Sequence, residues 1–291
     1  MANPIFTHTP AFNGSNQTSP QPGYQQYGQP GSQYSHPYGQ GSGYAPPTAG
    51  ELSAMYGAPA ASPVQTGRLT YDDVLVKTVG MFAVLLVGAT VGWLFAPMFP
   101  GMIFIAMLAG IVLGIVNWFK KQPSPALITT YSAVEGLFIG CISMVFNSMW
   151  DGIVVQAVVA TLAVFGVTLA LFASGKIRAS AKATRIFLIA SIGYVIFSLI
   201  NLGLMWTGAV NDPWGLRGSI TLMGIPLGVI IGIVAVLLAA YSLVIDFDAI
   251  QRGVRNGAPA RFAWKAAFAL VFDLVWLYLE ILRILAIFRD N

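Results

Sequence analysis

The sequence predicts an all-α, polytopic integral membrane protein with seven transmembrane helices. Of its 291 residues, 56% are hydrophobic and only 9% are charged, whereas a soluble domain carries about 25% charged residues. From residue 69 onward, apolar stretches of membrane-spanning length alternate with short polar connections. Basic residues gather in every second connection, which is the charge pattern of a multi-pass membrane protein.

Residues 1–68 form a separate block, which we expect to be a disordered cytoplasmic tail. The block consists mainly of Tyr, Gln, Gly, Pro and Ser, and Glu51 is its only charged residue before Arg68. Such a composition buries too little apolar surface to offset the entropy lost on ordering. The alternative is a tyrosine-rich arm that binds a partner. His8 and His36 stand alone in this block, so we expect neither to bind a metal.

The remaining residues, 69–291, are expected to form one transmembrane domain. A span needs about 20 apolar residues. No charge occurs between Lys77 and Lys120, which leaves room for two helices separated by the turn at Pro97–Gly101. The later spans follow in order between polar connections. We place the seven helices at 75–96, 101–119, 126–146, 152–173, 186–206, 219–248 and 262–288.

The basic residues also predict the orientation of these spans. With the first connection in the cytoplasm, all but three of the 15 Lys and Arg residues lie on the cytoplasmic side. Arg217 and Arg289 face outside, and Arg283 lies within the last span. This asymmetry predicts a plasma-membrane protein with a cytoplasmic N-terminus and an extracytoplasmic C-terminus. The cytoplasmic set comprises Arg68, Lys77, Lys120, Lys121, Lys176, Arg178, Lys182, Arg185, Arg252, Arg255, Arg261 and Lys265. Because topology and anionic lipid headgroups explain the net charge of +4, we expect no nucleic-acid partner.

Three carboxylates lie inside the predicted spans: Glu135, Asp246 and Asp273. A charge in hydrocarbon costs from about 3 to well over 10 kcal/mol, so such acids pair, face water or serve a function. With a rise of about 1.5 Å per residue, Glu135 and Asp273 both lie roughly 13 Å from the cytoplasmic ends of their helices. Asp246 lies near the inner end of the sixth helix. The three acids are therefore expected to share one polar cavity in the cytoplasmic half of the membrane.

Further polar residues accompany these acids. Asp246 and Asp248 are two residues apart and point about 200° apart on a helix, so only one faces the bundle. The other is expected at the inner interface, solvated or paired with Arg252. Glu280 shares a face with Asp273 and precedes Arg283 by three residues, which predicts a structural ion pair in the outer half. The alternative for this pair is an outer gate lining a pore.

Two chemical roles are open to the three acids. Carboxylates held close together cannot both ionise easily, so they share a proton and can act as a pH switch. When ionised, they repel one another or transiently hold a hard cation such as Ca²⁺. The structural alternative is a hydrogen-bonded cluster that packs helices together. We expect no fixed metal site, no cofactor and no enzymatic activity, because no soluble-enzyme motif is present and the GxGD signature of an intramembrane aspartyl protease is absent.

Three segments together resemble the Bax inhibitor-1 family, which includes bacterial members. They are Tyr131–Gly140 around Glu135, Leu243–Ile250 around Asp246, and the run from Phe272 to Arg283, in which an Asp precedes an Arg by ten residues. The resemblance covers residues 70–290 and leaves out the tail. It implies six helices around a central seventh. It also implies that Asp246 and Asp273 form a pH-sensing pair that gates Ca²⁺ leak, although Asp248 is an alternative partner for Asp273.

These observations lead to one expected function and one alternative. We expect a pH-sensitive cation leak channel, with Ca²⁺ as the conducted cation, gated by the carboxylate pair. Its expected partners are the lipid bilayer and Ca²⁺ or other cations. The alternative is a non-conducting regulator that binds other membrane proteins, such as a membrane protease. The small-residue series Gly110–Gly114 and Gly224–Gly228–Gly232 suit helix packing in either case.

Overall fold

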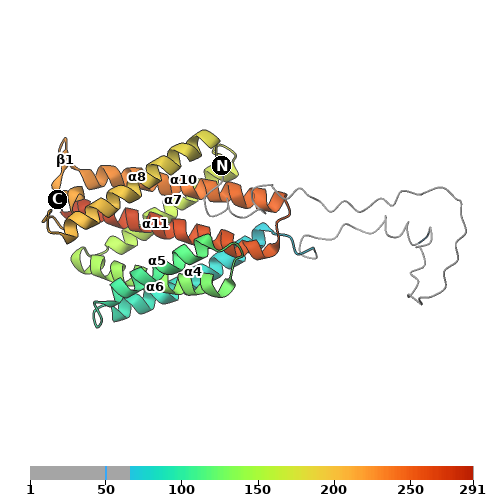
Figure 1. Cartoon of the computed structure of the whole chain (residues 1–291), viewed down its shortest axis with the longest axis horizontal. Helices are drawn as coiled ribbons and strands as arrows, with labels where there is room; N and C mark the ends of the chain where they lie inside the picture. Colours follow the sequence, from blue (N-terminus) through green and yellow to red (C-terminus); the bar gives the residue numbers. More distant parts are fainter. Residues whose placement is uncertain (1–49, 51–65, 291) are drawn as a thin grey trace, which may run out of the picture.

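The computed structural model describes residues 50 and 66–290, so most of the expected tail (1–68) lies outside the described residues. Within them, seven long helices follow one another, and all connections but the one over residues 207–226 are short (Figure 1). Their bounds are α4 Tyr71–Phe95, α5 Met102–Phe119, α6 Pro125–Met149, α7 Ile153–Ala173, α8 Ala181–Trp206, α10 Leu227–Arg255 and α11 Ala263–Asp290. The predicted all-α class is therefore confirmed.

Six of these helices, α4 to α8 and α10, are long and apolar enough to cross a membrane. They make the chain a multi-pass membrane protein. The seventh, α11, has 28 residues but carries Lys265, Asp273, Glu280, Arg283 and Arg289. Its surroundings differ from those of its neighbours, because α11 packs against α4, α6, α7 and α10 and occupies the middle of the bundle (Figure 1).

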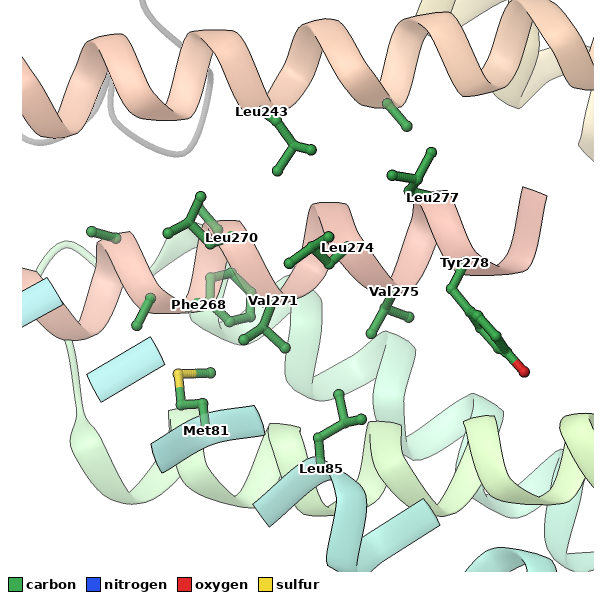
Figure 2. Packing of buried hydrophobic residues seen from close by; sticks show 14 of the residues in the cluster. Met81, Leu85, Leu243, Phe268, Leu270, Val271, Leu274, Val275, Leu277 and Tyr278 are labelled. Carbon is green, nitrogen blue, oxygen red and sulfur yellow. The ribbon is translucent and has the colours of Figure 1, made fainter. Parts of the chain in front are cut away.

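The core forms around α11. Leu277 and the small residues Ala266 and Ala267 of α11 are fully buried. Met81 and Leu85 of α4 approach one side of α11, and Leu243 of α10 approaches it from the opposite side (Figure 2). By contrast, α5 and α8 expose most of their large apolar side chains, as expected for helices that face lipid. The most polar of the long helices is thus the one most shielded from the membrane.

The helix boundaries follow local chemistry. Thr70 caps α4 with a reciprocal capping box to Asp73. Helix α10 continues to Arg255, beyond the predicted end at residue 248, because Asp248 pairs with Arg252 one turn later and two Arg residues favour the C-terminal end of the helix dipole.

The predicted start of the sixth helix at residue 219 is wrong. A short helix α9 (Leu216–Ser219) and a hairpin of β1 (Thr221–Leu222) and β2 (Ile225–Pro226) come first. The hairpin turns at Met223 and Gly224, which both have positive φ. The sequence suggested that Gly224 belongs to a helix-packing series with Gly228 and Gly232. It belongs to this turn instead.

The connections meet at two opposite ends of the bundle. At one end the Leu69 amide donates to the Ala258 carbonyl at 2.6 Å, and Lys265 Nζ donates to the Lys120 carbonyl at 3.2 Å. At the other end Trp214 Nε1 donates to Asp290 at 2.9 Å. Arg68, which the sequence assigned to the tail, makes a strand-like contact with Pro259 at the same end as Leu69. Helix α11 runs from the first end to the second.

Helices α4 and α6 approach at backbone distance through two glycine pairs. Gly88 and Gly92 of α4 face the α6 backbone, and Gly136 and Gly140 of α6 face the α4 backbone. A Cβ atom at any of these positions would clash with a carbonyl oxygen of the other helix. This small-residue packing fixes the position of α6, and hence of Glu135 next to Gly136.

Candidate functional site

Asp246 of α10 and Asp273 of α11 meet in the centre of the bundle. Their side chains are 0% and 3% exposed, and the carboxyl of Asp273 is hydrogen-bonded to Asp246 and to Ser242. A hydrogen bond between two carboxyl groups requires one of them to carry a proton, because an ionised carboxylate only accepts. The Ser242 hydroxyl donates a further bond. The two carboxyl groups can therefore share one proton in this apolar environment.

The connection between the two helices explains why these residues meet. Helix α10 ends at Arg255 and α11 begins at Ala263, so the two run antiparallel with a short link. Asp246 lies about 14 Å before the end of α10, and Asp273 about 15 Å after the start of α11, at a rise of 1.5 Å per residue. The equal depth predicted from the sequence thus corresponds to direct contact.

Asp248 lies away from the pair and contacts Arg252, which is one of the two environments expected for the second Asp of α10. Its Oδ2 atom lies 2.6 Å from Arg252 Nη1, in an i,i+4 pair at the basic end of the bundle. The Asp248 side chain is 16% exposed and that of Arg252 is 40% exposed. Asp246, and not Asp248, is therefore the partner of Asp273.

Glu135 of α6 lies beside the pair but is not part of it. The Tyr131 hydroxyl donates a hydrogen bond to its carboxylate. Gly110 of α5 makes room for this group, since a Cβ atom there would lie 2.7 Å from Glu135 Oε2. Glu135 and Asp273 line the same cavity of about 670 Å³, together with Ser242. The predicted shared cavity thus contains two of the three acids.

Glu280 and Arg283 form the predicted i,i+3 ion pair in the second half of α11. Two aromatic side chains complete the surroundings of Glu280. Tyr194 of α8 donates its hydroxyl to Glu280 Oε1, and Trp276 Nε1 donates to the same atom at 3.2 Å. Arg283 Nη2 donates to the Tyr194 oxygen at 2.8 Å. These residues form a partly buried polar cluster. We call it the outer cluster, because the sequence predicts that this half of the bundle is the outer one.

Arg217 is a member of the outer cluster that sequence reasoning missed. It was expected to face the exterior, but its side chain is only 5% exposed. Its Nη2 atom donates to Ser198 at 2.7 Å and to Tyr194 at 3.3 Å. The guanidinium also lies 5.5 Å from the centre of the Phe197 ring. The sequence held one signal that Arg217 could be buried: it is the only charged residue between Asp212 and Asp246.

The outer cluster is electrostatically unbalanced. It contains the guanidinium groups of Arg217 and Arg283 but the carboxylate of Glu280 alone. The central pair contains two carboxyl groups. Acidic groups therefore occupy the middle of the bundle, and an excess of positive charge lies toward the end that holds α9. Within the described residues, no group of three or more His, Cys, Asp or Glu side chains is arranged to hold a metal ion.

Comparison with known proteins identifies the family. The family model described as Bax inhibitor 1 like matches residues 3–290. The match includes the three segments that carry the resemblance and also extends over most of the N-terminal block, which the resemblance had left out. A search of curated proteins found no match. Because the family model covers nearly the whole sequence, the chain belongs to the Bax inhibitor 1 like family.

Proposed function

We propose that the protein is a non-enzymatic, pH-sensitive cation leak channel that conducts Ca²⁺ and is gated by Asp246 and Asp273. The single observation that carries this proposal is the contact of two buried carboxyl groups on neighbouring helices inside an apolar bundle. Ionisable groups at such a depth are costly, and membrane proteins retain them where protons or ions are handled.

The proton on the pair sets the state of the gate. When one carboxyl is protonated, its hydrogen bond to the other joins α10 to α11 and the bundle is closed. Loss of that proton leaves two negative charges close together in a low-dielectric environment, where repulsion is strong. Separation of the helices or binding of a cation relieves this repulsion. Ca²⁺ suits the role, because it binds carboxylate oxygens in flexible geometry.

Other polar residues support a route for cations through the bundle. Glu135 and Asp273 line one cavity, so a cation leaving the pair finds a second carboxylate. Toward the opposite end, the excess positive charge of Arg217 and Arg283 opposes cation passage in the closed state. A cation then moves outward only when this outer cluster rearranges.

We further propose that α11 is a seventh transmembrane helix and that the basic end of the bundle is cytoplasmic. The charges inside α11 are paired or buried against other helices: Asp273 contacts Asp246, and Glu280 contacts Arg283. Lys265 and Arg289 lie near its two ends. With seven crossings, the end carrying Lys120, Arg178 and Arg261 faces the cytoplasm of a cell with this protein in its plasma membrane.

Ca²⁺ flux into liposomes that contain the purified protein tests this proposal. A Ca²⁺-sensitive dye inside the vesicles should report entry well above that of protein-free vesicles, and a neutral sugar of similar hydrated size should stay outside. If the protein is monodisperse and helical but conducts no Ca²⁺ at any pH, the channel proposal is wrong. That result would favour the alternative, a non-conducting regulator that binds other membrane proteins.

A further inference from the structure

The cavity that contains Glu135 and Asp273 is lined mainly by α8 and α11, with Tyr131 and Glu135 of α6 beside them and Trp118 near the end of α5. We call this cavity the α5–α8 groove. Its volume is about 670 Å³, within the range of sites for drug-sized ligands. Helix α11 forms its floor with Phe272, Asp273 and Trp276, and α8 forms its longest wall. On that wall Ile192 is 60% exposed and Val195 is 53% exposed. These side chains stand where lipid tails surround a membrane protein, so the groove opens toward the hydrocarbon.

The polar groups of the groove are acidic. Glu135 and Asp273 are its only charged lining residues, and the other polar lining residues among those the structure describes are hydroxyl and indole side chains. Asp273 is only 3% exposed, yet its Oδ2 atom has no hydrogen-bond partner within the described residues. The hydroxyl of Ser191 on the facing wall is likewise without a partner there. The groove therefore offers hydrogen-bond acceptors to a ligand that brings donors.

The nearby cations of the bundle do not line the groove. Lys265 donates to the Lys120 carbonyl at the end of α5, and Arg283 is held by Glu280 and Tyr194. Within the described residues, the carboxyl groups of Glu135 and Asp273 are therefore not matched by a basic lining residue. Aromatic rings of Trp118, Phe272 and Trp276 stand beside the two acids and add faces that attract cations.

We propose that the α5–α8 groove binds lipophilic amines that enter from the bilayer. The protonated amine donates hydrogen bonds to Glu135 and Asp273, and its apolar tail lies along the exposed face of α8. Charge complementarity selects the ammonium head, and the lateral opening selects a molecule that partitions into the membrane. One consequence rests on the proposed function: an amine on Asp273 occupies the cation route and blocks Ca²⁺ flux. Binding itself does not depend on conduction.

Quenching of tryptophan fluorescence tests the binding directly, because Trp118 and Trp276 line the groove. The full chain is placed in phosphatidylcholine nanodiscs and titrated with 12-bromododecylamine, whose bromine quenches nearby indole rings. The probes 12-bromododecanol and 12-bromododecanoic acid carry the same tail with a neutral or an acidic head. We expect the amine to reach half-maximal quenching at a membrane concentration at least about tenfold below that of the alcohol.

Variants locate the head group. Glu135→Gln and Asp273→Asn should each reduce the preference for the amine over the alcohol several-fold, and Ser191→Phe should weaken quenching by all three probes by filling the groove. Asp248→Asn, which removes a carboxylate outside the groove, should leave the preference unchanged. Equal quenching by amine and alcohol would show a site for neutral lipid tails only and would overturn the proposal. So would an amine preference that survives both acid substitutions, or a dimer whose interface excludes every probe.

The same samples separate this inference from the proposed function. Quenching is measured without an ion gradient, so amine binding to a protein that conducts no Ca²⁺ would contradict the channel and leave the groove proposal standing. Conduction without amine preference would contradict the groove proposal alone.

Discussion

Asp246 and Asp248 are only two positions apart in the chain, but they lie on different faces of α10 and in different environments. Asp246 is fully buried against Asp273, whereas Asp248 reaches the basic end and pairs with Arg252. Helical geometry predicted that only one of them faces the bundle. It did not say which, because the direction of the face depends on how α10 packs against α11. Burial therefore assigns the two identical side chains to different roles.

The outer cluster gives a test at a single residue. Arg217→Gln should lower the free energy of unfolding by about 1–3 kcal/mol, because the bonds to Ser198 and Tyr194 are lost and their partly buried oxygens keep fewer donors. Thermal unfolding in detergent measures this change. Limited proteolysis should also cut the 207–226 connection faster, because Arg217 joins that connection to α8. Arg185→Gln, at an exposed position of α8, is the control and should leave both readouts unchanged. Equal stability of the two variants would show that Arg217 does not hold the connection in place.

At the scale of elements, the sequence predicted where the helices lie in the chain better than it predicted which helices pack together. The apolar stretches predicted all seven long helices, because length and hydropathy are local properties. The hairpin before α10 was missed, since a two-residue turn inside an apolar run leaves only Gly224 as a signal. The contact of Gly88 and Gly92 with α6 was also missed. Small residues show that helices can approach closely, but they do not name the partner helix.

The glycine contact between α4 and α6 predicts a selective cost for added methyl groups. Gly140→Ala should destabilise the protein by about 1–3 kcal/mol, because a Cβ atom there overlaps the Ala89 carbonyl of α4 and the backbones must separate. Thermal unfolding of the detergent-solubilised protein measures this cost. Gly193→Ala on α8 is the matched control, since its added methyl group meets nothing within 4 Å. If both variants unfold at the wild-type temperature, the α4–α6 packing is not as close as described.

At the scale of the whole molecule, the acids define a polar centre and the basic residues define one end. Glu135, Asp246 and Asp273 were predicted at one depth from residue counts alone. In the structure Asp273 contacts Asp246 and lines one cavity with Glu135. The position of Arg217 was not predictable in this way, because its inward turn depends on the short helix α9 and on hydroxyl groups of α8. Local counting gives depth, and tertiary contacts decide which side chains meet.

The orientation of the molecule gives a further prediction. Single cysteines placed at Gln122 and at Asp151, in a Cys141→Ser background, should react with a membrane-impermeant thiol reagent from opposite sides. Gln122 belongs to the basic end, and Asp151 follows α6 at the other end. In intact cells only the Asp151 position should be labelled, because the basic end faces the cytoplasm. Labelling of Gln122 in intact cells, with Asp151 protected, would invert the orientation.

The pH dependence of Ca²⁺ flux in proteoliposomes tests the carboxylate switch most directly. In the wild type, flux should rise with pH through one titration, because the pair is joined by its proton at low pH and repels itself after the proton leaves. Asp246→Asn and Asp273→Asn should each flatten this dependence, since one remaining carboxyl has no acidic neighbour to repel. Asp248→Asn and Glu280→Gln should keep it, as their carboxylates pair with Arg252 and Arg283. Wild-type pH dependence in both Asp246→Asn and Asp273→Asn, or loss of it in Asp248→Asn alone, would contradict gating by the Asp246–Asp273 pair.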